Sequence, residues 1–295
     1  MTTSQLDLAA RSLADGEPLS AATLAALASE PDILRLGMVA DEARRRATGR
    51  RVTYALVATV AVDGAPLSEV PADAVEVRLT GAPASLVSAV EAVRAAVAVA
   101  GDRVVSGFSL AHLTALAGAT GLAGVLQALR SAGLSRVAEA PIDGMAEPER
   151  SVGAVADAGF PELRLTIDRV PAGPRRSEAM LVARDLCARF PFITAVSHLP
   201  MVLNAFRPTT GYDDVRAVAL ARLAMPSGPA IQVDWLRYGP KLAQVALTFG
   251  ADDLDDVPPV TPGVEGVRRG TLAELTRNIE SAGYEAVARR GSLVR

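Results

Sequence analysis

The sequence predicts an α/β protein with a TIM-type (β/α) barrel, complete or partial, for two reasons. After about residue 50, short β-rich runs alternate with amphipathic runs of helical period, which is typical of a parallel sheet covered by helices. No glycine-rich turn of the dinucleotide-binding type follows the first of these runs. Six or seven such units therefore favour a barrel over a doubly wound sheet.

The individual elements can be placed in order along the chain. Residues 1–48 are expected to be a helical extension, in which Ser20 caps one helix and Gly49 ends a second that begins near Pro31. The expected strands are 52–62, 74–80, 103–108, 136–138, 162–167, 193–197 and 230–233, and the expected helices are 85–99, 121–132, 147–158, 177–189, 213–224 and 241–249. Residues 270–295 are expected to form a last helix and a tail, with Gly283 ending the helix.

Two stretches depart from this rhythm. Only about a dozen residues separate strand 52–62 from the strand that ends at Thr80, and a parallel crossover usually needs at least that many residues and a helix. Asp63-Gly64 is also a strong hairpin signal. We therefore predict a hairpin or a tight coil in place of the first helix, and an acidic, turn-rich loop over residues 252–266.

Composition limits the class of protein. The chain has 295 residues, 50% of them hydrophobic, which is sufficient for one barrel domain over residues 1–295. The net charge of −3 is spread in mixed clusters, so nucleic acid is not an expected partner. The first residues lack a basic signal region and no apolar run is long enough to span a bilayer. We therefore expect a cytoplasmic protein without membrane contact.

Metal-ligating residues are scarce. Cys187 is the single cysteine and lies in a helical pattern, where we expect a buried, inert thiol. The two histidines, His112 and His198, are not spaced as ligands of one ion. The sequence therefore predicts no metal site and no cofactor.

Several segments carry a family resemblance. The turn Pro208-Thr209-Thr210-Gly211-Tyr212, the stretch Ile231-Gln232-Val233-Asp234-Trp235 and the run from Gly239-Pro240-Lys241-Leu242 to Gly250-Ala251-Asp252-Asp253-Leu254 resemble aminofutalosine synthase, dehypoxanthine futalosine cyclase and the deazaflavin FO synthases. These are radical S-adenosylmethionine enzymes of menaquinone and deazaflavin biosynthesis. Weaker likeness extends the match to about residues 31–290. The resemblance implies the same barrel and a link to the futalosine pathway of menaquinone biosynthesis.

The chain differs from that family at the segments that bind the family's cluster and line its active site. The family's C-x-x-x-C-x-x-C loop, whose thiolates bind a [4Fe–4S] cluster, has no counterpart in residues 54–74. Its glycine pair after the second strand appears as Thr80-Gly81, and its Gly-Gly-Thr after Gly-Ala-Asx-Asp-Leu appears as Asp255-Asp256-Val257. We therefore expect a radical-SAM-like protein without iron–sulfur cluster and without radical activity.

If a ligand binds, it is expected at the carboxyl-terminal mouth of the strands. The candidate ligand-binding residues are Thr209, Thr210, Gly211, Asp234, Trp235, Lys241, Gly81 and His198. Two alternatives stay open for them: the turn at Thr210 is also compatible with a helix cap, and Trp235 with a core position. Asp168 and Asp234 suit either acid–base work or ion pairs with Arg169 and Arg237. No catalytic residue can be assigned.

Two functions compete on this basis. The first is a pseudoenzyme, a non-catalytic binding or partner protein that takes a nucleoside-like small molecule and assembles with a cluster-bearing paralogue or with itself. The second is a cluster-free enzyme that acts on a futalosine-like nucleoside or a related small metabolite by acid–base chemistry. The missing cluster loop and the two histidines favour the first.

Overall fold

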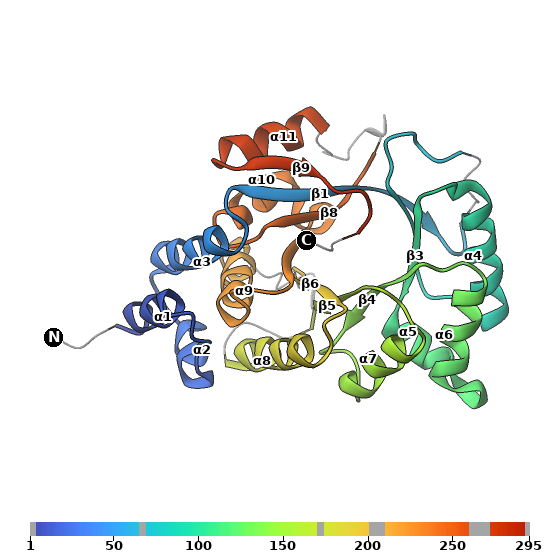
Figure 1. The fold of residues 1–295 in the computed structure, drawn as a ribbon, viewed down its shortest axis with the longest axis horizontal. Helices are drawn as coiled ribbons and strands as arrows, with labels where there is room; N and C mark the ends of the chain where they lie inside the picture. Colours follow the sequence, from blue (N-terminus) through green and yellow to red (C-terminus); the bar gives the residue numbers. More distant parts are fainter. Residues whose placement is uncertain (1–3, 65–68, 170–173, 201–209, 260–271, 293–295) are drawn as a thin grey trace.

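The computed structural model describes residues 4–64, 69–169, 174–200, 210–259 and 272–292 and has the predicted barrel (Figure 1). The eight barrel strands are β1 (Arg51–Ala61), β2 (Glu76–Thr80), β3 (Val104–Ser109), β4 (Arg136–Pro141), β5 (Leu163–Ile167), β6 (Ile193–His198), β7 (Ala230–Asp234) and β8 (Asp253–Val257). Each pairs in parallel with the next, and β8 pairs with β1, so the sheet closes on itself. The predicted TIM-type fold is confirmed.

Helices surround the barrel and precede it (Figure 1). They are α1 (Gln5–Ala14), α2 (Ala21–Leu27), α3 (Ile33–Thr48), α4 (Leu86–Ala100), α5 (Leu110–Leu116), α6 (Gly121–Ser131), α7 (Pro148–Asp157), α8 (Pro174–Arg189), α9 (Gly211–Ala224), α10 (Trp235–Leu247) and α11 (Leu272–Ser281), with a short 3₁₀ turn at Gly118–Thr120. Ser20 caps α2, and Gly49 ends α3 with a φ of 64°. The helical N-terminal extension is confirmed.

The connection between β1 and β2 was predicted to be either a hairpin or a tight coil. The hairpin is wrong, because β1 and β2 run parallel, with Val57 opposite Glu76. Residues 62–64 and 69–75 form turns and coil without a helix, as the coil alternative predicted, and residues 65–68 lie outside the described part of the chain. An apolar groove of about 280 Å³, lined by β1, β2 and α4, lies over the outer face of these strands.

The predicted acidic loop is wrong at its start, since residues 253–257 form β8. Leu254 points outward into the core, whereas Asp253 and Asp255 are buried. Burying an ionised carboxylate costs free energy unless a cation pairs with it, and both of these contact Arg289. A second short strand that the sequence analysis missed, β9 (Glu285–Ala288), pairs with the first residues of β1.

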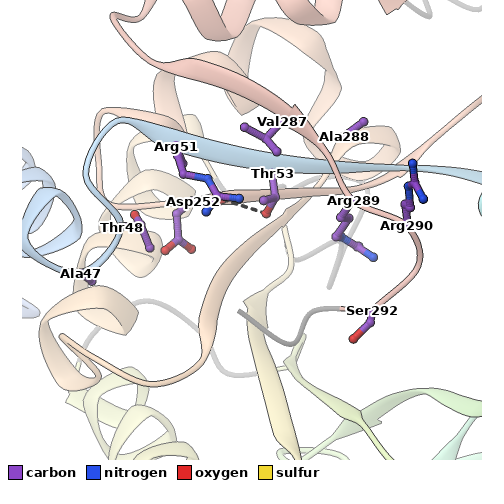
Figure 2. A pocket seen from close by; sticks show the side chains of 10 residues that line it. All are labelled: Ala47, Thr48, Arg51, Thr53, Asp252, Val287, Ala288, Arg289, Arg290 and Ser292. Carbon is purple, nitrogen blue, oxygen red and sulfur yellow. Dashed lines mark hydrogen bonds between the residues drawn. The ribbon is translucent and has the colours of Figure 1, made fainter.

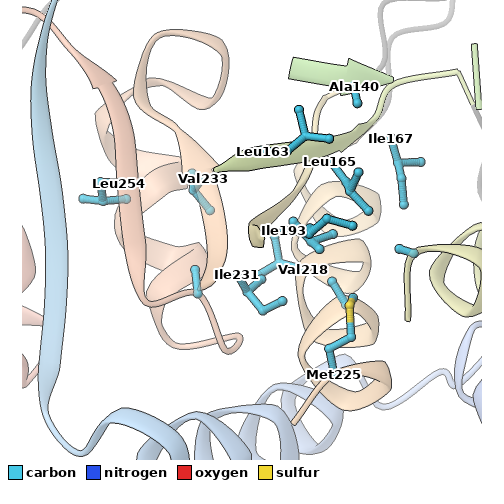
Figure 3. Close-up of a cluster of buried hydrophobic side chains, with 14 of the residues drawn as sticks. Ala140, Leu163, Leu165, Ile167, Ile193, Val218, Met225, Ile231, Val233 and Leu254 are labelled. Carbon is cyan, nitrogen blue, oxygen red and sulfur yellow. The ribbon is translucent and has the colours of Figure 1, made fainter. Parts of the chain in front are cut away.

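The hydrophobic core lies between the barrel and its helices. Figure 3 shows outward residues of the strands, among them Leu165, Ile193 and Ile231, packed against Val218 and Met225 of the α9 segment. The outward positions of the strands are therefore apolar. The inward positions of several strands are charged, and these build the interior described next.

Candidate functional site

The lower half of the barrel interior, at the amino-terminal ends of the strands, holds a buried ion network. Glu76 of β2 is completely buried and accepts hydrogen bonds from Arg78, Arg136 and Ser106. Burial alone would raise the pKa of Glu76, but Arg136 and Arg78 outweigh it and lower the pKa to about 2. Glu76 therefore stays ionised at neutral pH.

Asp255 of β8 is the centre of the same network. Its carboxylate lies 2.7 Å from Arg78, 2.8 Å from Arg164 and 2.7 Å from Arg289. Burial opposes ionisation, but these three guanidinium groups hold the pKa of Asp255 well below its usual range. We call the set Glu76, Arg78, Arg136, Glu162, Arg164, Asp253, Asp255 and Arg289 the lower network.

The C-terminal tail completes this network from below. Arg289 directly follows β9 and pairs with Asp253 and Asp255, while the Gly291 carbonyl accepts a hydrogen bond from Arg136. A cavity of about 550 Å³ lies beside the tail, lined by Thr48, Arg51, Thr53, Asp252 and residues 287–290 and 292 (Figure 2). Its buried polar groups bond to protein: Thr53 donates to Asp253 at 2.6 Å, and Asp252 pairs with Arg222 at 2.7 Å. This end is built for stability.

A second cavity, of about 200 Å³, lies at the carboxyl-terminal mouth of the barrel. We call it the mouth cavity. Its lining comes from six strands and the segments that follow them: Arg78, Leu79, Thr80, Gly81, Phe108, Ser109, His112, Ala138, Glu139, Arg164, Asp234, Arg237 and Asp256. The lining is thus mainly charged and polar, with Leu79, Phe108 and Ala138 as its apolar part.

Two carboxyl groups of the mouth cavity differ from those of the lower network. Burial raises the pKa of Asp234, although Arg164 opposes the effect. Burial likewise raises the pKa of Asp256 to about 6, against the opposing charge of Arg78. Oδ1 of Asp256 is buried without a hydrogen-bond partner, and so is Nε of Arg164. Buried polar groups are normally paired, so the cavity has unmet hydrogen-bonding capacity.

The backbone is strained at the same place. Among the described residues other than glycine, Phe108 with a φ of 64° and Asp256 with a φ of 56° have positive φ. Both line the mouth cavity. A positive φ is uncommon for phenylalanine, whereas aspartate adopts it more readily and Asp256 lies where the β1–β8 register shifts. Uncommon backbone conformations gather at functional sites. Strain and unmet polar groups therefore coincide at the mouth.

The predicted site residues fall in different places. Gly81 and Asp234 line the mouth cavity, and Asp234 also caps α10 by accepting from the Arg237 N–H. Thr210 forms a capping box with Asp213 at the start of α9, where Gly211 follows it, so the capping alternative for Thr210 is confirmed. Thr209 lies outside the described residues.

The other three predicted residues do not line the mouth cavity. Trp235 is 1% exposed and belongs to the core, and Lys241 is exposed on α10 beyond the kink at Gly239. His198 is buried with neither ring nitrogen hydrogen-bonded, and burial, helped by Arg176, lowers its pKa to about 3. A histidine with this pKa is a poor base at neutral pH.

Sequence reasoning missed most contributors to the mouth, among them Phe108, Glu139, Arg164 and Asp256. One signal did point to Asp256: it stands in Asp255-Asp256-Val257, where the family resemblance implies Gly-Gly-Thr.

The ion pairs expected for the two strand-end carboxylates are present, with Asp168 3.7 Å from Arg169 and Asp234 3.8 Å from Arg237.

The residues of this chain do not fit an iron–sulfur cluster. Three thiolates would be needed, and the sequence has one cysteine. Burial raises the pKa of the Cys187 thiol to about 12, so it stays protonated. Within the described residues, no three His, Cys, Asp or Glu side chains are grouped as metal ligands.

The helices were also compared with the length of a membrane span. In the described part of the chain, no single helix is long and apolar enough to cross a membrane. One bent pair of helices, Leu110–Leu116 with Gly118–Ser131, is together long and apolar enough for a span, by length and composition alone.

Sequence comparisons give short, partial matches, and no family model matches the chain. The chain is 37% identical over 79 residues to 5-amino-6-(D-ribitylamino)uracil–L-tyrosine 4-hydroxyphenyl transferase of Methanosphaerula palustris. It is 47% identical over 47 residues to aminodeoxyfutalosine synthase of Thermus thermophilus. These matches span 27% and 16% of this chain but only 20% and 13% of the two relatives.

Solved structures match the whole barrel. Methylornithine synthase superimposes with a TM-score of 0.66 at 15% identity, covering 96% of this chain and 98% of that one. The FeFe-hydrogenase maturase HydG from Carboxydothermus hydrogenoformans gives 0.67 at 12% identity, covering 96% and 79%. At such identities the likeness shows the fold. The chain thus has the TIM-type barrel fold of these solved structures, with a single cysteine and with distant, partial sequence similarity to enzymes such as aminodeoxyfutalosine synthase.

Proposed function

We propose that this chain is a non-catalytic binding protein that holds a small polar metabolite in the mouth cavity without a cluster of its own. The observation that carries the proposal is the coincidence, in one cavity, of unmet polar atoms on Asp256 and Arg164 with strained backbone at Phe108 and Asp256. Strained backbone and unpaired buried polar atoms both destabilise a folded protein. They are found mainly at sites with a function, such as binding a ligand.

The ligand that we propose is nucleoside-like. The partial similarity to aminodeoxyfutalosine synthase supports a link to menaquinone biosynthesis by the futalosine pathway. The mouth cavity of about 200 Å³ is below the range of about 300–1,000 Å³ typical of ligand sites. It therefore suits one part of a nucleoside, such as the base.

A binding protein acts through other proteins. We propose a cluster-bearing paralogue or a second copy of this chain as the partner, in the cytoplasm, because the family resemblance implies a cluster held by three thiolates and this chain has one cysteine. In this arrangement the barrel would carry or present a metabolite that the partner converts.

Metabolite capture from a cell extract, read by native mass spectrometry, tests the binding function. Thr80 lines the mouth cavity and Thr48 lines the lower cavity, so the same substitution can fill either one. Thr80→Trp should abolish the captured mass, and Thr48→Trp should retain it. Equal capture by both variants, or no captured metabolite with wild type, would refute the proposed function.

The second candidate function is acid–base catalysis on the same metabolite. It is favoured by Asp256, whose pKa of about 6 lies near the pH at which a general acid or base is most effective. The captured compound can be incubated with the protein in D₂O and followed by mass. Turnover or deuterium uptake that is lost in Asp256→Asn would show that the protein is an enzyme. An unchanged metabolite would support binding without catalysis.

A further inference from the structure

The balance of charge differs between the two halves of the barrel interior. In the lower network, four arginines face four carboxylates, and every carboxylate contacts at least one of these arginines. The mouth adds three carboxylates, on Glu139, Asp234 and Asp256, but only Arg237 as a further cation. Arg237 has a side chain that is 48% exposed and approaches Asp234 only to 3.8 Å. Counted over the lower network and the mouth together, seven described carboxylates face five described arginines, so the barrel interior as a whole has an excess of negative groups.

The contacts of these three carboxylates are also longer than those below. Glu139 lies 3.4 Å from Arg164, and Asp256 lies 4.0 Å from Arg78. Both arginines already bond Asp255 at 2.7–2.8 Å. The guanidinium groups are thus committed to the lower network, and Oδ1 of Asp256 remains a buried acceptor without a donor.

A second observation indicates that a ligand completes the cavity. Arg164 is 7% exposed and lines the cavity, yet its Nε has no hydrogen-bond partner. A buried donor and a buried acceptor are therefore both unmet around one space, whereas a self-sufficient charge network would pair them with each other. Leu79 and Phe108 line the same cavity and offer an apolar surface to the rest of a ligand.

We propose that Asp256, together with Asp234, binds a cationic nitrogen group of the ligand, an ammonium or an amidinium, in the mouth cavity. The inference rests on the proposed binding function and adds the charge of the group that is recognised. An N–H of such a ligand would donate a charge-assisted hydrogen bond to the unpaired Oδ1 of Asp256.

Binding of this kind is linked to protons. A cation prefers ionised Asp256, and burial raises the pKa of Asp256 to about 6. Affinity should therefore be constant above pH 7 and fall as the pH drops below 6, by up to about tenfold per pH unit. A neutral or anionic ligand would not show this dependence.

Three probes of one shape and different charge test the inference: benzamidine, benzamide and benzoate. The changes in backbone amide NMR shifts of the folded protein report binding at pH 7.5. Benzamidine should bind at least tenfold more tightly than benzamide or benzoate, and Asp256→Asn should remove the preference. Asparagine tolerates positive φ, so this variant should keep the backbone of β8. Asp185→Asn, on the 77% exposed Asp185 side chain of α8, is the matched control and should keep the preference.

Each outcome decides the inference. Equal binding of the three probes, tighter binding of benzoate, an unchanged preference in Asp256→Asn, or no benzamidine binding at millimolar concentration would overturn it. These results do not depend on metabolite capture. If Thr80→Trp loses the captured metabolite but benzamidine is not preferred, the proposed function stands and the cation site falls. If no metabolite is captured, the proposed function falls first.

Discussion

The lower network and the mouth cavity are built from the same residue types on the same strands, yet they treat buried charge in opposite ways. Below, Asp255 has three arginine partners and a lowered pKa. Above, the adjacent residue Asp256 has an unpaired oxygen and a pKa raised to about 6. Of these two adjacent residues of β8, Asp255 thus has a carboxylate that stabilises the fold, and Asp256 has one that destabilises it. Unpaired buried polar atoms, more than cavity size, distinguish the end of the barrel at which we propose that the ligand binds.

The largest expected effect comes from removing the centre of the lower network. Asp255→Ala leaves Arg78, Arg164 and Arg289 without their shared carboxylate. Unpairing a buried ion network costs about 3–5 kcal/mol, so the free energy of unfolding measured with urea should fall by that amount. Asp185→Ala, on the surface, should change it by less than about 0.5 kcal/mol. A small effect of Asp255→Ala would mean that water reaches the network.

The tail should contribute less than Asp255. Arg289→Ala removes one partner from Asp253 and one from Asp255, but Asp255 keeps Arg78 and Arg164. We expect a loss of about 2–4 kcal/mol in the same urea measurement. Metabolite capture should persist at low temperature, because the mouth cavity does not include the tail. Loss of capture in the folded variant would contradict the separation of the two halves.

At the mouth, removing a charge should stabilise the protein. The pKa of Asp256 is raised from 3.8 to about 6, so the folded state binds more protons than the unfolded state between these pH values, and ionisation weakens the fold as the pH rises through 6. Asp256→Asn should therefore raise the free energy of unfolding by about 1–3 kcal/mol at pH 8. The gain should shrink toward pH 4. A destabilised variant at pH 8 would show that Asp256 belongs to the lower network.

The smallest effect is expected outside both halves. Thr210 forms its capping box with Asp213 at the surface, and loss of such a cap costs about 0.5–2 kcal/mol. Thr210→Ala should lower the thermal midpoint slightly and leave metabolite capture unchanged. A strong loss of capture without a loss of stability would return this turn to the binding site.

The barrel could be predicted because its outward positions carry local patterns. Leu163, Leu165 and Ile167 alternate with polar residues along β5, and caps such as Ser20 mark helix starts. The hairpin prediction at Asp63-Gly64 failed because a two-residue signal says nothing of which edge of β1 must be paired to close the barrel.

The inward positions could not be predicted in the same way. The arginine partners of Asp253 and Asp255 lie on β2, on β5 and in the tail, between 34 and 177 residues away in the chain. Without those partners an acidic run is typical of a solvated loop. For the same reason Asp256 was noticed as a departure from a family pattern and not as part of a cavity, whereas Asp234 was found because it ends a clear strand.

The position of the captured metabolite tests the central claim most directly. Difference electron density in crystals of the protein with its captured compound would show it at atomic detail. We expect density in the mouth cavity, in contact with Asp256, Asp234 or Arg164. Density in the lower cavity, beside Thr48 and Arg51, would contradict it.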